Sequence, residues 1–152
     1  MKLNWKSCSI TVGLSIVLVA VVVVEIALFI SGPSRKYEQS IVQEESRITS
    51  NYKNIKELTR HAFYYTTYVG EQGNQLLWFN EEGKKIVSKK KSSLQMEEAT
   101  KIARETYGAS DIEVTLGYGY KNPAYVIQSD VGCILLDYDT LKEVYFLKEG
   151  DV

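Results

Sequence analysis

The residues best suited to chemistry lie near the C-terminal end, where the apolar run Ile134–Leu136 is followed by Asp137, Asp139 and Thr140. An aspartate at the end of a strand, with a second aspartate two positions on, is typical of phosphatases whose first carboxylate attacks phosphorus beside Mg²⁺. Those enzymes place this strand early in a large parallel α/β domain, and here only a short segment follows Thr140. We therefore expect a strand that leads into a tight turn, in which these polar side chains bond backbone amides.

The chain has one histidine, His61, and two cysteines, Cys8 and Cys133. Any Ser-His-Asp or Cys-His pair must therefore use His61, and nothing in the sequence brings Cys133 to it. Cys133 lies in an apolar, strand-like run, which favours a buried and inert thiol. The His and Cys clusters typical of metal sites are absent from the sequence. We expect no catalytic centre, no metal, no cofactor and no small-molecule substrate.

Five lysines form a basic cluster around the end of a predicted strand: Lys84, Lys85, Lys89, Lys90 and Lys91. Such a cluster can meet an anionic membrane surface, a cell-wall polymer or an acidic patch on a partner. The alternative is a solvated linker between two halves of the chain. The chain as a whole has 18 basic and 19 acidic residues, so we expect no nucleic-acid partner.

Tyrosine is unusually frequent, with 11 residues in the chain, and several tyrosines alternate along predicted strands. They can form a binding face for a protein or a glycan. They can equally pack a thin core with each hydroxyl at its edge. Gly117 and Gly119 alternate with two of these tyrosines and are expected to mark a strand bend or bulge.

A largely apolar run from Ile10 to Ile30 decides on which side of a membrane the residues after it lie. As a helix it would span about 31 Å, which matches the ~30 Å hydrocarbon core of a bilayer. A secretory signal peptide is the alternative, but its apolar region is shorter. Pro33 would also follow a cut after Gly32 and hinder the peptidase. We expect a retained transmembrane helix over residues 10–30.

The orientation of this helix is predicted from positive charge. Lys2 and Lys6 precede the run, and Arg35 and Lys36 follow it, so the positive-inside bias is weak. A short head before a large domain still favours an N-in, C-out anchor. We expect a protein that crosses the cell membrane once. Its head, residues 1–9, is expected in the cytoplasm, and the domains after the span are expected outside the cell.

Glu25 is an ionisable residue inside the predicted span. Such residues are costly in a bilayer and indicate function by default. One hypothesis is that its carboxyl pairs with a polar group on a partner's transmembrane helix. The other is that Glu25, close to Ile30, reaches toward the outer headgroups.

The segment after the anchor reads as the same small unit twice. The first unit has a helix from Ser34 to about Leu58, in which Ile41, Ile48 and Ile55 share one face. The second has a helix with a capping box at Ser92 and Gln95 and a glycine stop at Gly108. The predicted strands of the two units are 61–69, 75–79 and 84–88, followed by 112–120, 124–128, 133–138 and 143–148.

A helix followed by an antiparallel meander predicts an α+β fold. We expect two small cystatin-like domains, each a helix packed on a curved antiparallel sheet, over residues 34–91 and 92–150. Each is small enough to bury little surface alone, so the two halves are expected to pack together.

The second unit resembles the PepSY domain. Leu94–Ala99 is similar to that domain's opening helix, and Tyr125–Ile127 with Leu136–Val144 is similar to its paired strands and Asp-x-x-Thr-Gly-Lys turn. Leu141 stands where that pattern prefers glycine.

The whole layout of an anchor, a short cystatin-like repeat similar to DUF5590 and a PepSY-like repeat resembles the TseB (YpmB) family of Gram-positive bacteria. This resemblance implies two extracytoplasmic domains, no enzymatic activity and a role in cell-wall elongation through a penicillin-binding protein. We expect an accessory protein that binds such a synthase and tunes it. The alternatives are a peptidase-inhibiting or chaperone-like module, and a hydrolase acting through His61 or Asp137.

Overall fold

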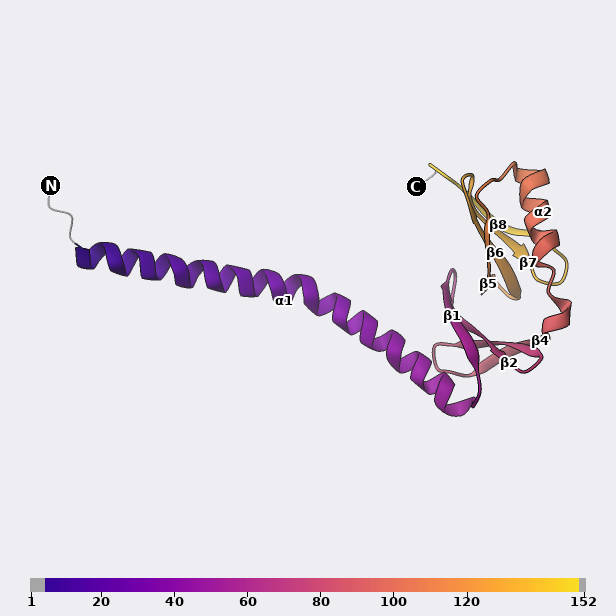
Figure 1. The fold of residues 1–152 in the computed structure, drawn as a ribbon, viewed down its shortest axis with the longest axis horizontal. Coiled ribbons are helices and arrows are strands. Elements are labelled where there is room, and N and C mark those ends of the chain that lie inside the picture. The colour runs from indigo at the N-terminus through magenta and orange to yellow at the C-terminus, as the bar shows by residue number, and fades with distance from the viewer. Residues whose placement is uncertain (1–4, 151–152) are drawn as a thin grey trace. The chain divides into compact units, whose positions relative to one another are not determined.

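The structure is a computed structural model that describes residues 5–150, except for the side chains of residues 5–9 and 27–34. Lys2 and the side chains of Lys6 and Cys8 in the predicted head therefore lie outside the described part. The chain divides after Gln43 into two compact units. The first is entirely helical where it is described, and the second holds both sheets (Figure 1).

Helix α1 (Trp5–Asn51) is one continuous helix that contains the predicted apolar run and continues beyond it. The described apolar side chains of the run itself are well exposed, for example Ile10 at 65%, Leu14 at 67% and Leu18 at 66%. Over the residues that the structure describes, no helix has a stretch both long and apolar enough to cross a membrane.

The second unit begins within α1 and continues into a four-stranded antiparallel meander. Its strands are β1 (Lys56–Ala62), β2 (Thr66–Gln72), β3 (Gln75–Asn80) and β4 (Lys85–Lys90), in that spatial order. The helix predicted to reach about Leu58 instead ends at Asn51, and Asn54 takes a left-handed φ of 66°. Because asparagine tolerates this conformation, the chain can turn there without glycine.

The strand predicted over residues 61–69 is wrong, because this segment is a hairpin. Strand β1 ends at Ala62 and β2 begins at Thr66, and the Phe63 N–H donates to the Tyr65 carbonyl across the turn. Aromatic residues fill this turn in place of the Gly, Asn or Pro that normally marks one. The composition therefore looked like that of a single strand.

Strand β3 is covered on both faces, which explains its unbroken apolar sequence. Leu77 and Phe79 pack with Ile48 near the end of α1. We call residues 44–91 of this unit its first half and residues 92–150 its second half. Leu76 and Trp78 point to the opposite face and join the core of the second half. Each of these β3 side chains is at most 2% exposed, so β3 lies in the interior of this unit.

A short helix η1 (Lys91–Ser93) leads to α2 (Met96–Tyr107). The predicted capping box is wrong, because Gln95 is the N-cap and has no side-chain cap bond. Instead, the Gln95 N–H donates to the Tyr125 hydroxyl at 2.8 Å. The predicted stop is confirmed, since Gly108 has a φ of 70° and its N–H bonds the end of the helix.

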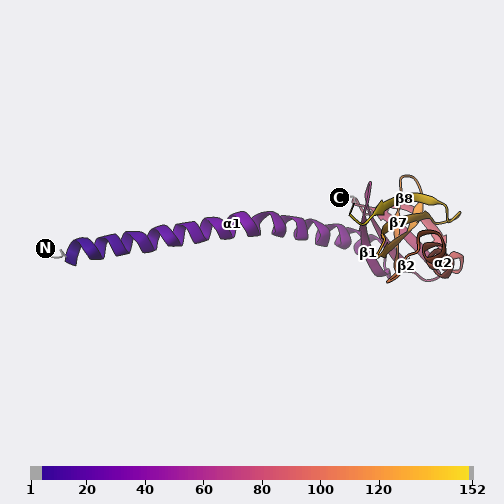
Figure 2. The same cartoon turned by 90° about the horizontal axis from the view of Figure 1, so that it is seen from above.

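The second sheet is also an antiparallel meander, and Figure 2 shows two of its strands, labelled β7 and β8, from above. Its strands are β5 (Glu113–Tyr118), β6 (Pro123–Ser129), β7 (Gly132–Asp137) and β8 (Glu143–Lys148). The last strand matches its prediction, β6 and β7 differ by one residue at their ends, and β5 is shorter than predicted. Ala99 and Ala103 of α2 are fully buried in the core on one face of this sheet.

The fold is thus α+β with two four-stranded antiparallel sheets. The two halves pack together, as expected, because Val69, Leu76 and Trp78 share one core with Tyr125 and Ile134. The domain boundaries at residues 34–91 and 92–150 stay predictions.

Candidate functional site

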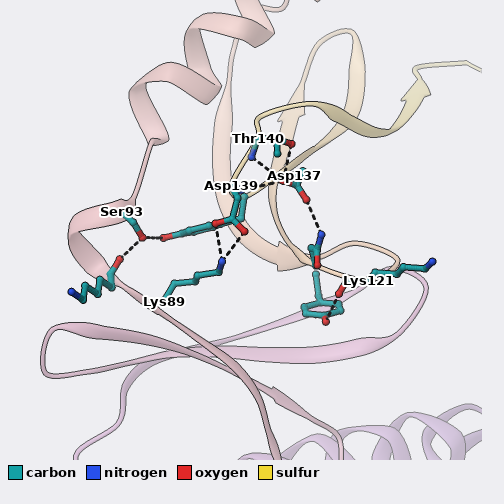
Figure 3. Close-up of polar contacts among 10 residues, drawn as sticks. Lys89, Ser93, Lys121, Asp137, Asp139 and Thr140 are labelled. Atoms are coloured by element: carbon teal, nitrogen blue, oxygen red, sulfur yellow. Dashed lines mark hydrogen bonds and ion pairs between the residues drawn. The ribbon is translucent and has the colours of Figure 1, made fainter.

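Asp137 lies at the end of β7 and holds the turn into β8 (Figure 3). Its Oδ1 accepts hydrogen bonds from the Asp139 N–H at 3.1 Å and from the Thr140 N–H and Oγ1, both at 2.8 Å. The Asn122 amide donates to Oδ2 at 3.2 Å. Burial raises the pKa of Asp137, but these hydrogen bonds together lower it below its ordinary value.

The phosphatase arrangement is not formed around Asp137. Strand β7 pairs antiparallel with both β6 and β8, whereas that chemistry needs a parallel α/β sheet. The expected turn is confirmed for Asp137 and Thr140, whose contacts are those of an Asx-type turn. Leu141, at the position where the PepSY-like pattern prefers glycine, takes a left-handed φ of 56°.

Asp139 binds a lysine of the first half rather than a backbone amide. Lys89 Nζ lies 2.7 Å from both carboxylate oxygens of Asp139 and 5.7 Å from the centroid of the Tyr138 ring. Tyr138 in turn stacks on Tyr125 at 5.2 Å, and its hydroxyl lies 3.1 Å from Ser93 Oγ. An aromatic face and a carboxylate together hold this ammonium group (Figure 3).

The five predicted basic residues do not share one environment. Lys89 pairs with Asp139, and Lys91 pairs with Glu71 at 2.5 Å. Lys84, Lys85 and Lys90 are exposed. Two of the five charges are therefore compensated within the protein, and contact of the others with an anionic surface stays a prediction.

Glu25 lies in α1 with its side chain exposed, and no contact of it is described that would pair its charge. Contact of Glu25 with a partner in the membrane stays a prediction as well.

His61 is half-buried in β1 and contacts the second sheet. Its Nδ1 accepts a long hydrogen bond of 3.4 Å from the Tyr118 N–H, and burial lowers its pKa. Cys133, in β7, is also half-buried, so that its pKa is raised, and its described partner is the Gln128 amide. His61 and Cys133 are thus engaged with different neighbours. Over the described residues, no group of three or more His, Cys, Asp or Glu is placed to hold a metal ion.

An open groove of about 610 Å³ lies where the β1–β2 hairpin meets the second half, and we call it the tyrosine groove. The first half contributes the tip of the hairpin and the β3–β4 turn, and the second half contributes two tyrosines at the end of β5. Its lining residues are Tyr64, Tyr65, Thr66, Thr67, Asn80, Glu81, Glu82, Ile86, Tyr118 and Tyr120.

Three of the four tyrosines of the groove are exposed and contact one another edge to face, whereas Tyr118 is half-buried. Tyr64 is 64% exposed, Tyr65 54% and Tyr120 46%. The Tyr64 ring lies 4.7 Å from that of Tyr65 and 5.5 Å from that of Tyr120, at interplanar angles of 87° and 60°. Next to them Phe63 packs 5.2 Å from Tyr120 and 5.0 Å from Tyr145, which fixes the hairpin tip on the second sheet.

The polar part of the groove is acidic. Glu81 and Glu82 are exposed on the β3–β4 turn, where the Asn80 side chain accepts a 2.9 Å hydrogen bond from the Lys84 N–H. Among the residues that line the groove, there are two carboxylates and no lysine, arginine or histidine. Burial, and then the neighbouring Tyr65, raises the pKa of Tyr118 above 10.0, so this phenol is neutral at pH 7.

Sequence reasoning missed this groove, although part of its signal was visible. The tyrosine count suggested a binding face, but Tyr64 and Tyr65 were assigned to the middle of a strand. The structure places them at the tip of a hairpin, beside tyrosines from the other half of the chain.

Comparison of the chain with protein-family models gives no match. Comparison with curated proteins and comparison with solved structures also give none. The resemblance to the TseB (YpmB) family therefore stays a prediction from the motifs.

Proposed function

We propose that the protein is a membrane-anchored, extracytoplasmic accessory protein that binds a penicillin-binding protein and regulates it during cell-wall elongation. It acts by contact rather than by catalysis. The observation that carries the proposal is the continuity of α1, in which one helix bears the exposed apolar stretch and also packs Ile48 into the first sheet.

The anchor is proposed from the apolar run Ile10–Ile30 and from the exposure of its described side chains. Apolar surface left in water costs roughly 25 cal/mol per Å², and a bilayer removes that cost. In the proposed topology residues 1–9 are cytoplasmic, and the second unit lies outside the cell membrane.

The finer fold is proposed to be cystatin-like in each half. The end of α1 packs on the first meander through Ile48, and α2 packs on the second through Ala99 and Ala103. A helix on an antiparallel sheet is the arrangement expected for both halves, and it agrees with the PepSY-like motifs of the second.

Contact with a membrane partner suits this arrangement physically. A tether confines the second unit to the layer of water in which an anchored synthase works, which raises its effective concentration. The tyrosine groove offers an exposed aromatic surface of the kind enriched at protein interfaces. Asp137 accepts a hydrogen bond from the Thr140 N–H within its own turn, and His61 accepts one from the Tyr118 N–H. These contacts favour structural roles for both side chains.

Co-purification from native membranes tests the proposal. The full chain, tagged at its C-terminus, is extracted in mild detergent after the cells are treated with a fluorescent penicillin. We expect a penicillin-labelled band to co-purify with the chain, and the chain to stay in the membrane fraction after alkaline carbonate washing.

Two results would contradict the proposal. One is release of the chain by carbonate, which would exclude an anchor. The other is the absence of any penicillin-labelled band from a tagged chain that supports normal growth. Inhibition of an extracellular protease by the purified full chain, without a labelled band, would favour a peptidase-inhibiting module instead.

The variant Glu25→Leu separates the membrane contact from the anchor. If Glu25 pairs with the partner's transmembrane helix, the variant stays membrane-bound and recovers less of the labelled band. Equal recovery would leave Glu25 without a role in this contact.

A further inference from the structure

We propose that the tyrosine groove docks a lysine or arginine side chain from an extended segment of the partner protein. The identity of that partner rests on the proposed function, whereas the chemistry of the groove does not.

Charge complementarity is the first argument. Glu81 and Glu82 line the groove without a cationic residue among its lining. No described ion pair involves either carboxylate. Arg60 reaches the lining residue Thr66, with Nη2 3.5 Å from its Oγ1, but does not itself line the groove. Near Glu81, the described contact of the Arg47 guanidinium is with the backbone carbonyl oxygen, 3.5 Å from Nη1. The charge of the lining therefore favours a cationic occupant.

The aromatic walls are the second argument. The face of a tyrosine ring carries negative electrostatic potential and attracts a cation within about 6 Å. Tyr64 meets Tyr65 and Tyr120 at steep interplanar angles, and all three rings remain exposed. Ring surface is therefore available beside the two carboxylates.

The protein already holds one of its own lysines in this way. Lys89 Nζ lies over the Tyr138 ring at 5.7 Å and pairs with Asp139 at 2.7 Å. A tyrosine face and a carboxylate thus bind an ammonium group elsewhere in this unit. The groove presents the same two kinds of group, with Tyr65 and Glu81 among them, and leaves them open.

The shape of the groove favours an extended segment over an enclosed small molecule. It is open to solvent, and its lining adds the hydroxyls of Thr66 and Thr67 and the amide of Asn80 to the rings. The hairpin tip is fixed by Phe63 against Tyr120 and Tyr145. Binding therefore requires little ordering of the groove, which lowers its entropic cost.

The test measures peptide binding to the full chain in phosphatidylcholine nanodiscs. The probe is a fluorescent peptide of alternating lysine and alanine, and the matched probe carries Nε-acetyllysine instead. A chitin tetrasaccharide serves as the glycan competitor. We expect the lysine peptide to bind, and the acetylated peptide and the tetrasaccharide to bind at least about tenfold more weakly.

Two sets of variants locate the site. The double variant Glu81→Gln and Glu82→Gln, and separately Tyr65→Ala, should weaken binding of the lysine peptide about tenfold. The control is the double variant Glu97→Gln and Glu98→Gln, which removes the same charge from exposed positions of α2. It should leave the affinity unchanged. Unchanged thermal unfolding of every variant shows that the fold is kept.

Three outcomes would overturn the inference, and a fourth would overturn only the proposed partner. Equal weakening by both glutamate pairs would show unspecific attraction to net charge. Tighter binding of the tetrasaccharide, lost on Tyr65→Ala, would assign the groove to a glycan. Full recovery of a penicillin-labelled band by the groove variants would disprove the docking site alone. Binding of the peptide without any labelled band would disprove the proposed partner alone.

Discussion

Trp78 Nε1 donates a 2.8 Å hydrogen bond to the carbonyl oxygen of Gly117, and this bond joins the first sheet to the second. The N–H of the same peptide group, on Tyr118, reaches His61 Nδ1 at 3.4 Å. Because β5 is an edge strand, its backbone groups need partners from outside its own sheet. Two side chains of the first half supply them, and the same junction places Tyr118 beside the hairpin that carries Tyr64 and Tyr65.

Replacing Trp78 by Phe should destabilise the protein through the loss of this donor. The Gly117 carbonyl would stay buried without its partner, which costs about 1–3 kcal/mol, and the smaller ring adds a cavity. We expect the free energy of unfolding to fall by about 2–4 kcal/mol in urea denaturation. Tyr120→Phe, at an exposed ring, is the control and should change it by less than about 0.5 kcal/mol. A Trp78→Phe variant as stable as the parent would show that the bond contributes nothing.

Gly117 is predicted to be required because a side chain there would meet the first half. A Cβ would lie 2.5 Å from His61 Nδ1 and 2.6 Å from Val126 Cγ2. Gly117→Ala should therefore cost about 1–3 kcal/mol of unfolding free energy. Gly108→Ala is the control for a glycine substitution without a steric contact. Gly108 has a φ of 70°, so alanine there is strained, but nothing lies within 4 Å of its Cβ.

A double-mutant cycle with His61→Ala shows whether His61, rather than Val126, limits the space at Gly117. The cost of Gly117→Ala should fall by about 0.5–3 kcal/mol in the His61→Ala background, because one clashing group is gone. The cost of Gly108→Ala should be the same in both backgrounds. Additive costs at Gly117 would show that His61 does not limit the approach of the two halves.

His61 should make the stability of the protein depend on pH as the pH falls through its ordinary pKa of 6.5. Burial lowers its pKa in the folded state below the ordinary 6.5. As pH falls through 6.5 the unfolded chain takes up a proton that the folded state resists, so stability is lost until the folded pKa is passed. His61→Gln should flatten the curve in this window. The lowered pKa values of Asp130 and Asp137 act only at more acidic pH. A His61→Gln curve parallel to the parent's would contradict this account.

At position 141, replacement by glycine should destabilise the protein less than replacement by alanine. Its φ of 56° lies in the left-handed region, and its side chain packs partly against the core. Replacement by either residue loses that packing, but glycine avoids the left-handed penalty of roughly 1–2 kcal/mol. Leu141→Gly should therefore be about 1 kcal/mol more stable than Leu141→Ala in urea denaturation. Alanine at least as stable as glycine would show that the turn relaxes away from this conformation.

Local patterns predicted the elements whose signals are local. Gly108 ends α2 through its own left-handed conformation, and β8 follows from a run of apolar residues between charged ends. The cap of α2 was not predictable in this way, because the Gln95 N–H is bonded by Tyr125, far along the chain. The hairpin tip was hidden since Phe63 is held by contacts to Tyr120 and Tyr145 rather than by turn residues.

The groove could not be predicted from either half alone. Tyr64 and Tyr65 form it only with Tyr118 and Tyr120, and the junction at Gly117 brings these pairs together. The basic cluster illustrates the reverse case, because Lys89 is compensated by Asp139 across the halves. Closeness in the sequence therefore predicted a basic cluster whose charge is partly compensated, and it did not predict the tyrosine groove.

The central claim is that the tyrosine groove of an anchored chain contacts a penicillin-binding protein, and site-specific cross-linking in native membranes tests it most directly. A photoreactive phenylalanine replaces Tyr65 in the full chain, or Glu105 on the exposed surface of α2 as the control. Cells are irradiated and then labelled with fluorescent penicillin. We predict a labelled adduct, heavier by the mass of this chain, from position 65 and not from position 105. No labelled adduct from position 65, or equal adducts from both positions, would contradict the claim.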